Sequence, residues 1–196
     1  TAPKGLRLKV LESGADIGLA LDGDADRLIV VDEQGRVIDG DQIMALMTLN
    51  MKETGRLQGE GLVTTVMSNL GLERFLEAEG MKIERTKVGD RFVLERMKAL
   101  GWNVGGEQSG HMILSDYATT GDGMVAALQV LSVMVRQDRT ASDVLNMFSP
   151  VPQVLKNVRF SGANPLETQP VQDVIKAVEA DFGKSGRLVI RKSGTE

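Results

Sequence analysis

Short apolar runs alternate along the chain with longer segments whose apolar residues recur every three or four positions. The short runs predict strands and the longer periodic segments predict helices. The predicted strands cover residues 16–21, 28–32, 36–38, 62–67, 81–85, 102–104 and 111–114. Three helices are predicted between them, capped by Asp39–Asp41, Ser68 and Asp90 and ended by Gly55, Gly80 and Gly101. This alternation predicts an α/β domain with a parallel or mixed sheet.

The chain continues with two more predicted helices and then a break. Residues 124–135 are apolar on almost every side, which favours a helix buried on several faces. Thr140 and Asp143 form a capping box for a short helix that would reach Phe148. The stretch SPVPQ that follows, with Pro150 and Pro152, is the best linker candidate.

A smaller unit is predicted after this linker. Residues 154–160 and 188–190 are strand-like, and between them a helix is predicted that Gly183 would end. Its apolar stripe comprises Val171, Val174, Ile175, Val178 and Phe182. Two strands and one helix in roughly 45 residues are short for a stable domain. This part of the chain is therefore expected to be a truncated α+β domain.

Composition narrows the possible functions. The 196 residues carry a net charge of -4, which argues against a broad nucleic-acid surface, and no cysteine, which excludes disulfides and thiolate metal sites. No apolar run is long enough for a membrane span, and the stretch TAPKGLRLKV lacks a signal-peptide core. A cytoplasmic protein without membrane or nucleic-acid partners is expected. A chain that begins with Thr also suggests processing or a fragment.

Three carboxylates crowd into the stretch DGDADR between two apolar runs. Asp22, Asp24 and Asp26 would repel one another unless a cation neutralised them, and hard divalent cations prefer oxygen ligands. An EF-hand is excluded because its sixth position should be glycine but is Arg27, and because the flanks are strand-like. Guanidinium beside a metal suits phosphoryl oxygens. A metal loop is favoured over a solvated turn.

Two further loops carry polar groups suited to a sugar phosphate. In TKVGDR, Lys87 and Arg91 add positive charge where a strand meets a helix, although the spacing alone favours a simple cap at Asp90 and a solvated lysine. In GGEQSGH, Glu107 and Ser109 could bind sugar hydroxyls. This loop ends at His111, the only histidine, for which a structural and a functional role are equally open.

The last stretch, RKSGTE, could form a phosphate-binding nest after a strand. Its candidate residues are Arg191, Ser193, Gly194 and Thr195. No complete P-loop pattern occurs in the chain, and this signal is weak alone.

Taken together, DGDADR, GEQSGH and RKSGTE resemble, in order and in sequence, the loops of the α-D-phosphohexomutase family. The forms KVGDR and MSNLGL are most similar to its bacterial branch that acts on glucosamine phosphates. A phosphomannomutase or phosphoglucomutase of the same superfamily, or a non-catalytic module that binds divalent ions or sugar phosphates, remains an alternative. Oligomeric state is left open.

The resemblance implies a mixed-sheet α/β domain of the phosphohexomutase type and a magnesium-dependent phosphoryl transfer on a hexosamine phosphate. It implies that Asp22, Asp24 and Asp26 bind Mg²⁺, that Arg27 orients a phosphoserine, that Lys87 is the acid or base, and that His111 lies near the substrate. The implied substrate-binding residues are Asp90, Arg91, Glu107, Ser109, Arg191, Ser193, Gly194 and Thr195.

The resemblance also implies how the chain is divided. Residues 1–38 would be the end of a second domain with the metal loop, 39–148 a complete third domain, and 149–196 a truncated fourth. The family's phosphoserine loop lies in its first domain, and nothing in this sequence matches it. The 196-residue chain alone is therefore expected to be inactive.

Overall fold

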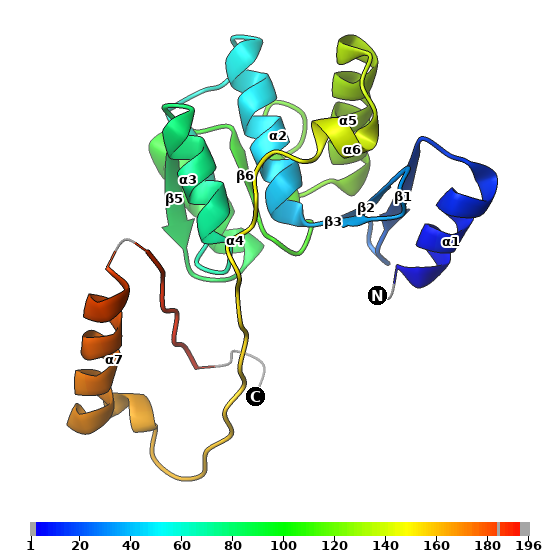
Figure 1. The fold of residues 1–196 in the computed structure, drawn as a ribbon. Coiled ribbons are helices and arrows are strands. Elements are labelled where there is room, and N and C mark those ends of the chain that lie inside the picture. Colours follow the sequence, from blue (N-terminus) through cyan, green and yellow to red (C-terminus); the bar gives the residue numbers. More distant parts are fainter. Residues whose placement is uncertain (1–2, 184, 193–196) are drawn as a thin grey trace. The chain divides into compact units, whose positions relative to one another are not determined.

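A computed structural model describes residues 3–183 and 185–192. The chain divides into two compact units, Thr1–Pro150 and Val151–Glu196 (Figure 1). The helices of the first unit are α1 (Lys4–Ser13), α2 (Gly40–Glu53), α3 (Leu70–Ala78), α4 (Asp90–Leu100), α5 (Gly123–Gln137) and α6 (Ala141–Val144). Its strands are β1 (Ile17–Leu21), β2 (Leu28–Asp32), β3 (Val37–Ile38), β4 (Gly61–Thr65), β5 (Lys82–Thr86), β6 (Val104–Gly106) and β7 (Met112–Leu114).

The first three strands form an antiparallel sheet in the order β1-β2-β3. Leu21 pairs with Leu28, so the six residues between them, DGDADR, form the hairpin loop. Helix α1, which the hydrophobic pattern did not predict, packs on this sheet through Val10. Leu8 and Leu11 of the same helix stay exposed, and this explains why no clear amphipathic stripe marks it.

The remaining strands form a mixed sheet in the order β5-β4-β6-β7. β4 runs parallel to both β5 and β6, and β7 is antiparallel to β6. The predicted mixed-sheet α/β domain is thus confirmed. All five residues of β4 are buried, as expected for a strand covered on both faces. Leu62 points into the cluster formed with α2, α3 and α5, whereas Val63 points to the cluster under α4.

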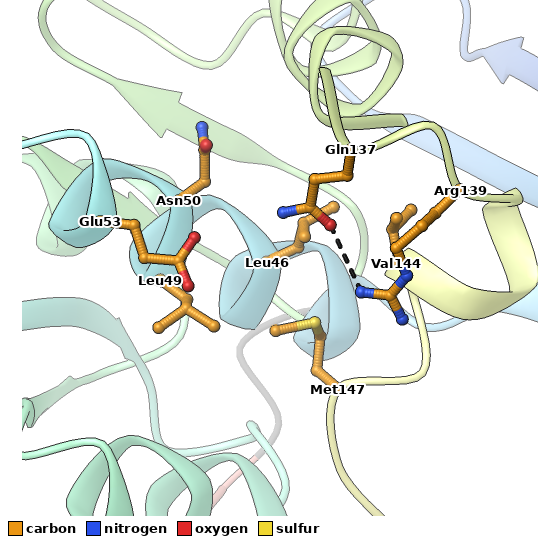
Figure 2. Close-up of a pocket in the computed structure, with 8 residues that line it drawn as sticks. All are labelled: Leu46, Leu49, Asn50, Glu53, Gln137, Arg139, Val144 and Met147. Atoms are coloured by element: carbon orange, nitrogen blue, oxygen red, sulfur yellow. Dashed lines mark hydrogen bonds between the residues drawn. The ribbon is translucent and has the colours of Figure 1, made fainter. Parts of the chain in front are cut away.

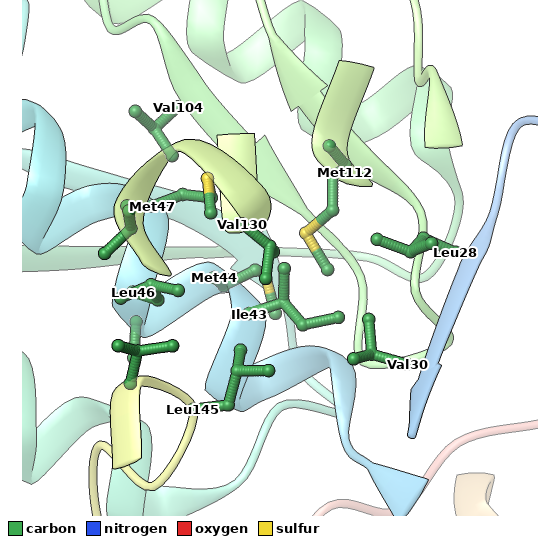
Figure 3. Packing of buried hydrophobic residues seen from close by; sticks show 14 of the residues in the cluster. Leu28, Val30, Ile43, Met44, Leu46, Met47, Val104, Met112, Val130 and Leu145 are labelled. Atoms are coloured by element: carbon green, nitrogen blue, oxygen red, sulfur yellow. The ribbon is translucent and has the colours of Figure 1, made fainter. Parts of the chain in front are cut away.

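The larger core cluster is built around α2, which is buried along most of its length. In Figure 3, Ile43, Met44 and Met47 of this helix lie among Val104 and Met112 of the sheet, and Val130 of α5 packs beside them. Leu28 and Val30 of the first sheet belong to the same cluster. One core therefore holds the hairpin, with DGDADR (residues 22–27, here called the acidic loop) at its tip, against the α/β domain.

Several predicted boundaries shift. Asn69 caps α3 instead of Ser68, because its side chain accepts a hydrogen bond from the Gly71 amide. Asp90 is the first residue of α4 and Gly89 is its N-cap, with φ 130°, a value that glycine adopts most readily. The helix capped by Thr140 ends at Val144 rather than at Phe148.

In the second unit the structure contains a 3₁₀ helix, η1 (Pro165–Glu167), and the predicted helix, here α7 (Gln169–Phe182). The strands predicted at 154–160 and 188–190 are wrong: neither range is paired with a strand among the described residues. A strand needs a partner for its backbone groups and cover for its side chains. Val154 is instead 91% exposed and Val158 73%. The described part of this unit is helical, not α+β.

In the part of the chain that the structure describes, none of the helices is long and apolar enough to cross a membrane.

Candidate functional site

The acidic loop is held at the tip of the β1–β2 hairpin. Ligand oxygens of Asp22, Asp24 and Asp26 lie within 4.8 Å of one another. The backbone folds back at Ala25, which has φ 59°, and the amide of Arg27 donates to Asp22 Oδ1 over 3.2 Å. This turn brings the three carboxylates together on the hairpin tip, with Asp24 exposed and the other two partly buried.

The start of α5 fixes this loop from the other side. The amide of Gly123 donates to the carbonyl of Ala25 over 2.9 Å. A Cβ at Gly123 would lie 2.9 Å from the carbonyl oxygen of Arg27 and 3.0 Å from that of Ala25. Only glycine allows the helix to approach the loop this closely. The sequence pattern did not reveal this contact.

The acidic loop is also joined to GGEQSGH. The amide of Leu28 donates to the carbonyl of Gly110 over 3.0 Å, and Arg27 forms an isolated antiparallel bridge with His111. A Cβ at Gly110 would lie 2.3 Å from the carbonyl oxygen of Leu28, and Gly110 itself has φ 95°. The predicted metal loop and the predicted sugar loop are therefore neighbours, although the residues that join them are more than 80 positions apart in the sequence.

A second contact joins GGEQSGH to TKVGDR (residues 86–91), here called the lysine loop. The amide of Gly89 donates to Glu107 Oε1 over 2.9 Å. Lys87 is exposed, as is Ser109. Because TKVGDR follows β5 and GGEQSGH follows β6, both loops leave the carboxyl ends of parallel strands. That edge is where ligands bind in open α/β sheets.

The two charged residues at the start of α4 have partners within that helix. Asp90 Oδ1 accepts from the amide of Arg91 over 2.7 Å, and the Arg91 guanidinium donates to Glu95 over 2.7 Å. Both side chains are exposed. They end the lysine loop, and among the described residues their side chains form no hydrogen bond or ion pair with Glu107 or Asp26.

The amino end of α2 supports the sugar loop. A Cβ at Gly40 would lie 2.4 Å from the carbonyl oxygen of Gln108, and the Gln108 side chain donates to Asp39 Oδ2 over 3.4 Å. One residue along, Asp41 is buried, and its Oδ2 accepts from the amide of Asn69 over 2.7 Å. Burial raises the pKa of the Asp41 carboxyl to about 6. From the sequence, Asp39–Asp41 is expected only to cap a helix.

The fourth predicted loop lies in the second unit. Arg191 is described and exposed, whereas Ser193, Gly194 and Thr195 lie outside the described residues. This loop therefore belongs to a different compact unit from the other three loops.

One pocket of the first unit lies elsewhere. It is lined by residues of α2 and of the segment 137–147: Leu46, Leu49, Asn50, Glu53, Gln137, Arg139, Val144 and Met147 (Figure 2). Gln137 ends α5, whereas Gly123, which contacts the acidic loop, begins it. A helix of 15 residues is about 22 Å long, so this pocket is remote from the acidic loop.

The acidic loop has the donors that a hard divalent cation requires. Its three side chains offer carboxylate oxygens, and no other described residues form a comparable group. Asp26 Oδ1 is buried and has no hydrogen-bond partner among the described residues. A buried carboxylate oxygen without a hydrogen bond is costly, and a bound cation would compensate for this cost. The residues therefore fit a divalent ion such as Mg²⁺.

The sequence and fold of the chain match those of known proteins. Residues 39–151 match the family model "Phosphoglucomutase/phosphomannomutase, alpha/beta/alpha domain III". Proteins named phosphoglucosamine mutase from Sphingopyxis alaskensis and Azorhizobium caulinodans are 65% and 61% identical to the whole chain. The chain spans 44% of the length of each.

Solved structures show the same fold. A phosphoglucomutase/phosphomannomutase family protein from Burkholderia thailandensis is 25% identical, with a TM-score of 0.69 over 76% of this chain and 33% of its own. The N-acetylphosphoglucosamine mutase of Aspergillus fumigatus is 22% identical, with a TM-score of 0.74 over 91% of this chain and 42% of its own. Because the family model covers more than half of the residues of this chain, the chain belongs to the phosphoglucomutase/phosphomannomutase family.

Proposed function

We propose that the protein containing this chain is a phosphoglucosamine mutase, which interconverts glucosamine 6-phosphate and glucosamine 1-phosphate. The observation that carries the proposal is the meeting of three loops. Hydrogen bonds from Leu28 to Gly110 and from Gly89 to Glu107 join the acidic loop, the sugar loop and the lysine loop. The names of relatives 59–65% identical support glucosamine as the sugar.

The metal belongs to the acidic loop in this proposal. Asp22, Asp24 and Asp26 would hold Mg²⁺, which would withdraw charge from a phosphoserine supplied by another part of the protein. Arg27 is half exposed beside Asp26, with its Nε 3.9 Å from Asp26 Oδ1. It would orient the phosphoryl group from there, since guanidinium binds phosphoryl oxygens well.

In this proposal, the sugar phosphate is bound by the sugar loop, the lysine loop and the loop at residues 191–195. Glu107 and Ser109 would bind sugar hydroxyls, and Lys87 would take the proton from the hydroxyl that attacks the phosphoserine. Asp90 and Arg91, at the end of the lysine loop, would also contact the substrate. Arg191, Ser193, Gly194 and Thr195 would hold the phosphate that does not react. The phosphoryl group passes to the sugar, giving a bisphosphate, and the serine recovers a phosphoryl group from the other end.

We further propose that residues 1–38, 39–148 and 149–196 belong to three successive domains of the whole protein. The 196-residue chain alone would then lack turnover, because the serine that carries the phosphoryl group is not in it.

Two rival functions differ from this proposal in testable ways. A phosphomannomutase/phosphoglucomutase would prefer other sugars, and a non-catalytic module would bind sugar phosphate or metal without turnover.

The deciding experiment compares kcat/KM of the intact protein for the 6-phosphates of glucosamine, glucose and mannose. A preference for glucosamine is expected. A preference for glucose or mannose would replace the proposal with the rival mutase, and binding without turnover of any of the three would leave only the binding module.

Asp24→Ala in the intact protein tests the metal loop. Asp24 is the exposed member of the three carboxylates. Because Asp24 would be a direct metal ligand, its loss should lower Mg²⁺-dependent kcat/KM by about 100-fold or more, a larger effect than the roughly 10- to 100-fold loss typical of residues that hydrogen-bond a metal ligand. Asp16→Ala, an exposed carboxylate before β1, is the matched control and should leave activity unchanged. Unchanged turnover in Asp24→Ala would remove the metal assignment.

A further inference from the structure

His111 lies behind the acidic loop and is almost fully buried. It is the only histidine of the chain, it precedes β7, and it is 2% exposed. Its Nδ1 lies 3.0 Å from Asp26 Oδ2. An ionised carboxylate can only accept a hydrogen bond, so Nδ1 carries the proton. The imidazole therefore donates to the third carboxylate of the loop.

Gly121 closes the opposite side of the ring. A Cβ built on Gly121 would lie 2.2 Å from both Cε1 and Nε2 of His111. Nε2 is buried and has no hydrogen-bond partner among the described residues. The ring is thus clamped between the backbone at Gly121 and the side chain of Asp26. Because the His111 side chain is almost fully buried, the geometry favours a role other than direct contact with a substrate.

The two oxygens of Asp26 have different surroundings. Oδ2 accepts from His111, whereas Oδ1 is the buried oxygen without a hydrogen-bond partner in the described residues. Arg27 Nε is 3.9 Å from Oδ1, beyond hydrogen-bond distance. Fixing Oδ2 stops the carboxylate from rotating and leaves Oδ1 as the oxygen available to a cation beside Asp22 and Asp24.

We propose that His111 is a positioning residue of the metal site: its Nδ1–H holds Asp26 in the orientation that binds the cation, and it acts through Asp26 rather than on the substrate. The inference rests on the proposed metal function of the acidic loop. Carboxylates that bind metals are commonly held by hydrogen bonds behind them, and losing such a partner typically weakens metal binding about 10- to 100-fold.

Two substitutions separate the two ring nitrogens. In His111→Asn the amide NH₂ falls near the position of Nδ1 and can still donate to Asp26. In His111→Gln the amide falls near Nε2 and cannot. Mn²⁺ affinity of the intact protein, measured by electron paramagnetic resonance at one fixed pH, should fall about 10-fold or more in His111→Gln and stay within about threefold in His111→Asn.

Gly121→Ala gives a test that removes no polar group. Its Cβ would displace the ring from the side of Nε2, so Mn²⁺ affinity should fall although His111 is present. Thermal unfolding of each variant shows whether the fold is kept. A ¹⁵N spectrum of the 196-residue chain, in which His111 is the only histidine, gives an independent result that no variant affects: the proton should be on Nδ1.

The outcomes distinguish the inference from the proposed function. If the wild type binds Mn²⁺ and folded His111→Gln binds it equally well, or His111→Asn is as weak as His111→Gln, the positioning role is overturned. A neutral ring whose single proton is on Nε2 overturns it too, even if the variants do not fold. If the wild type itself fails to bind Mn²⁺, the metal function fails and the inference falls with it.

Discussion

At the scale of single residues, the candidate site is made of common polar side chains whose positions are set by hydrogen bonds to neighbouring loops. Glu107 illustrates this, because one carboxylate oxygen accepts from the Gly89 amide and so holds the lysine loop beside the sugar loop. Lys87 itself is exposed. Its proposed role as acid or base therefore depends on where the loop holds it and not on burial.

Lys87→Ala should lower kcat of the intact protein about 100-fold or more, with a smaller change in KM, because a general acid or base typically contributes about 10²- to 10⁴-fold. Steady-state kinetics with glucosamine 6-phosphate measures the two constants. Lys98→Ala, at an exposed lysine in the last turn of α4, is the control and should change neither. An effect confined to KM would make Lys87 a substrate-binding residue instead.

At the scale of elements, α2 links the core to the site. Its amino end lies under the sugar loop at Gly40, and its middle is the centre of the larger core cluster. Two properties follow from its burial, one from the packing of its apolar residues and one from the buried carboxylate of Asp41.

Met47→Ala should lower the free energy of unfolding by about 2–5 kcal/mol, because Met47 is 1% exposed and its truncation leaves a cavity. Urea unfolding followed by the fluorescence of Trp102, the only tryptophan and a member of the second core cluster, measures this. Val135→Ala on α5 is the control: Val135 is 81% exposed, and the change should stay within about 0.5 kcal/mol. Equal losses in the two variants would contradict the packing described for α2.

Asp41 makes stability depend on pH. Burial raises its pKa to about 6, above the roughly 3.9 of an unfolded aspartate. Between these two values the folded state binds the proton more readily, so the Asp41 contribution to stability falls as pH rises from 4 to above 6. At pH 8 the folded protein contains a buried charge at Asp41, partly compensated by the Asn69 amide.

Asp41→Asn removes that charge and keeps an acceptor for Asn69. We expect it to raise the free energy of unfolding at pH 8 by about 1–3 kcal/mol, with the gain shrinking toward zero at pH 4. Urea unfolding at both values of pH checks this. Asp138→Asn, at an exposed carboxylate, should show no such pH-dependent gain. A gain of the same size at pH 4 would contradict the argument.

At the scale of the whole molecule, the two units differ in how much they bury. The first unit has two core clusters and two sheets, and Leu28 and Val30 of the hairpin share a core with α2. In the described part of the second unit no residue of α7 is buried, and the segment 151–160 has no regular structure. The two units should therefore differ in resistance to proteolysis.

Trypsin should cut first after Lys156 or Arg159, which are exposed in that segment, and leave a resistant fragment that contains the first unit. Mass spectrometry of a digestion time course identifies the sites. Lys52 and Lys98, exposed but within helices of the first unit, serve as internal controls and should be cut later. Early cleavage after either of them would contradict the difference between the units.

Much of this organisation follows from local sequence. Short apolar runs predicted the strands of the first unit, and apolar residues recurring every three or four positions predicted most of its helices. A fully buried strand such as β4 and an amphipathic helix such as α4 can each be recognised from their own residues. Helix α1 was not predicted, because Val10 is its only buried residue and no apolar stripe marks it. The two strands predicted in the second unit were wrong, because apolar residues favour a strand but do not show whether a partner strand is present.

The chemistry divides in the same way. The sequence by itself determined which residue types occur in each loop: three alternating carboxylates, a lysine beside glycine and aspartate, and a polar glycine-rich stretch. Only the tertiary structure decided that these loops meet, that Gly121 and Gly123 permit the close approaches, and that His111 faces Asp26. The physical reason is that local spacing fixes side-chain chemistry, whereas hydrogen bonds between residues more than 80 positions apart depend on how strands pair and helices pack.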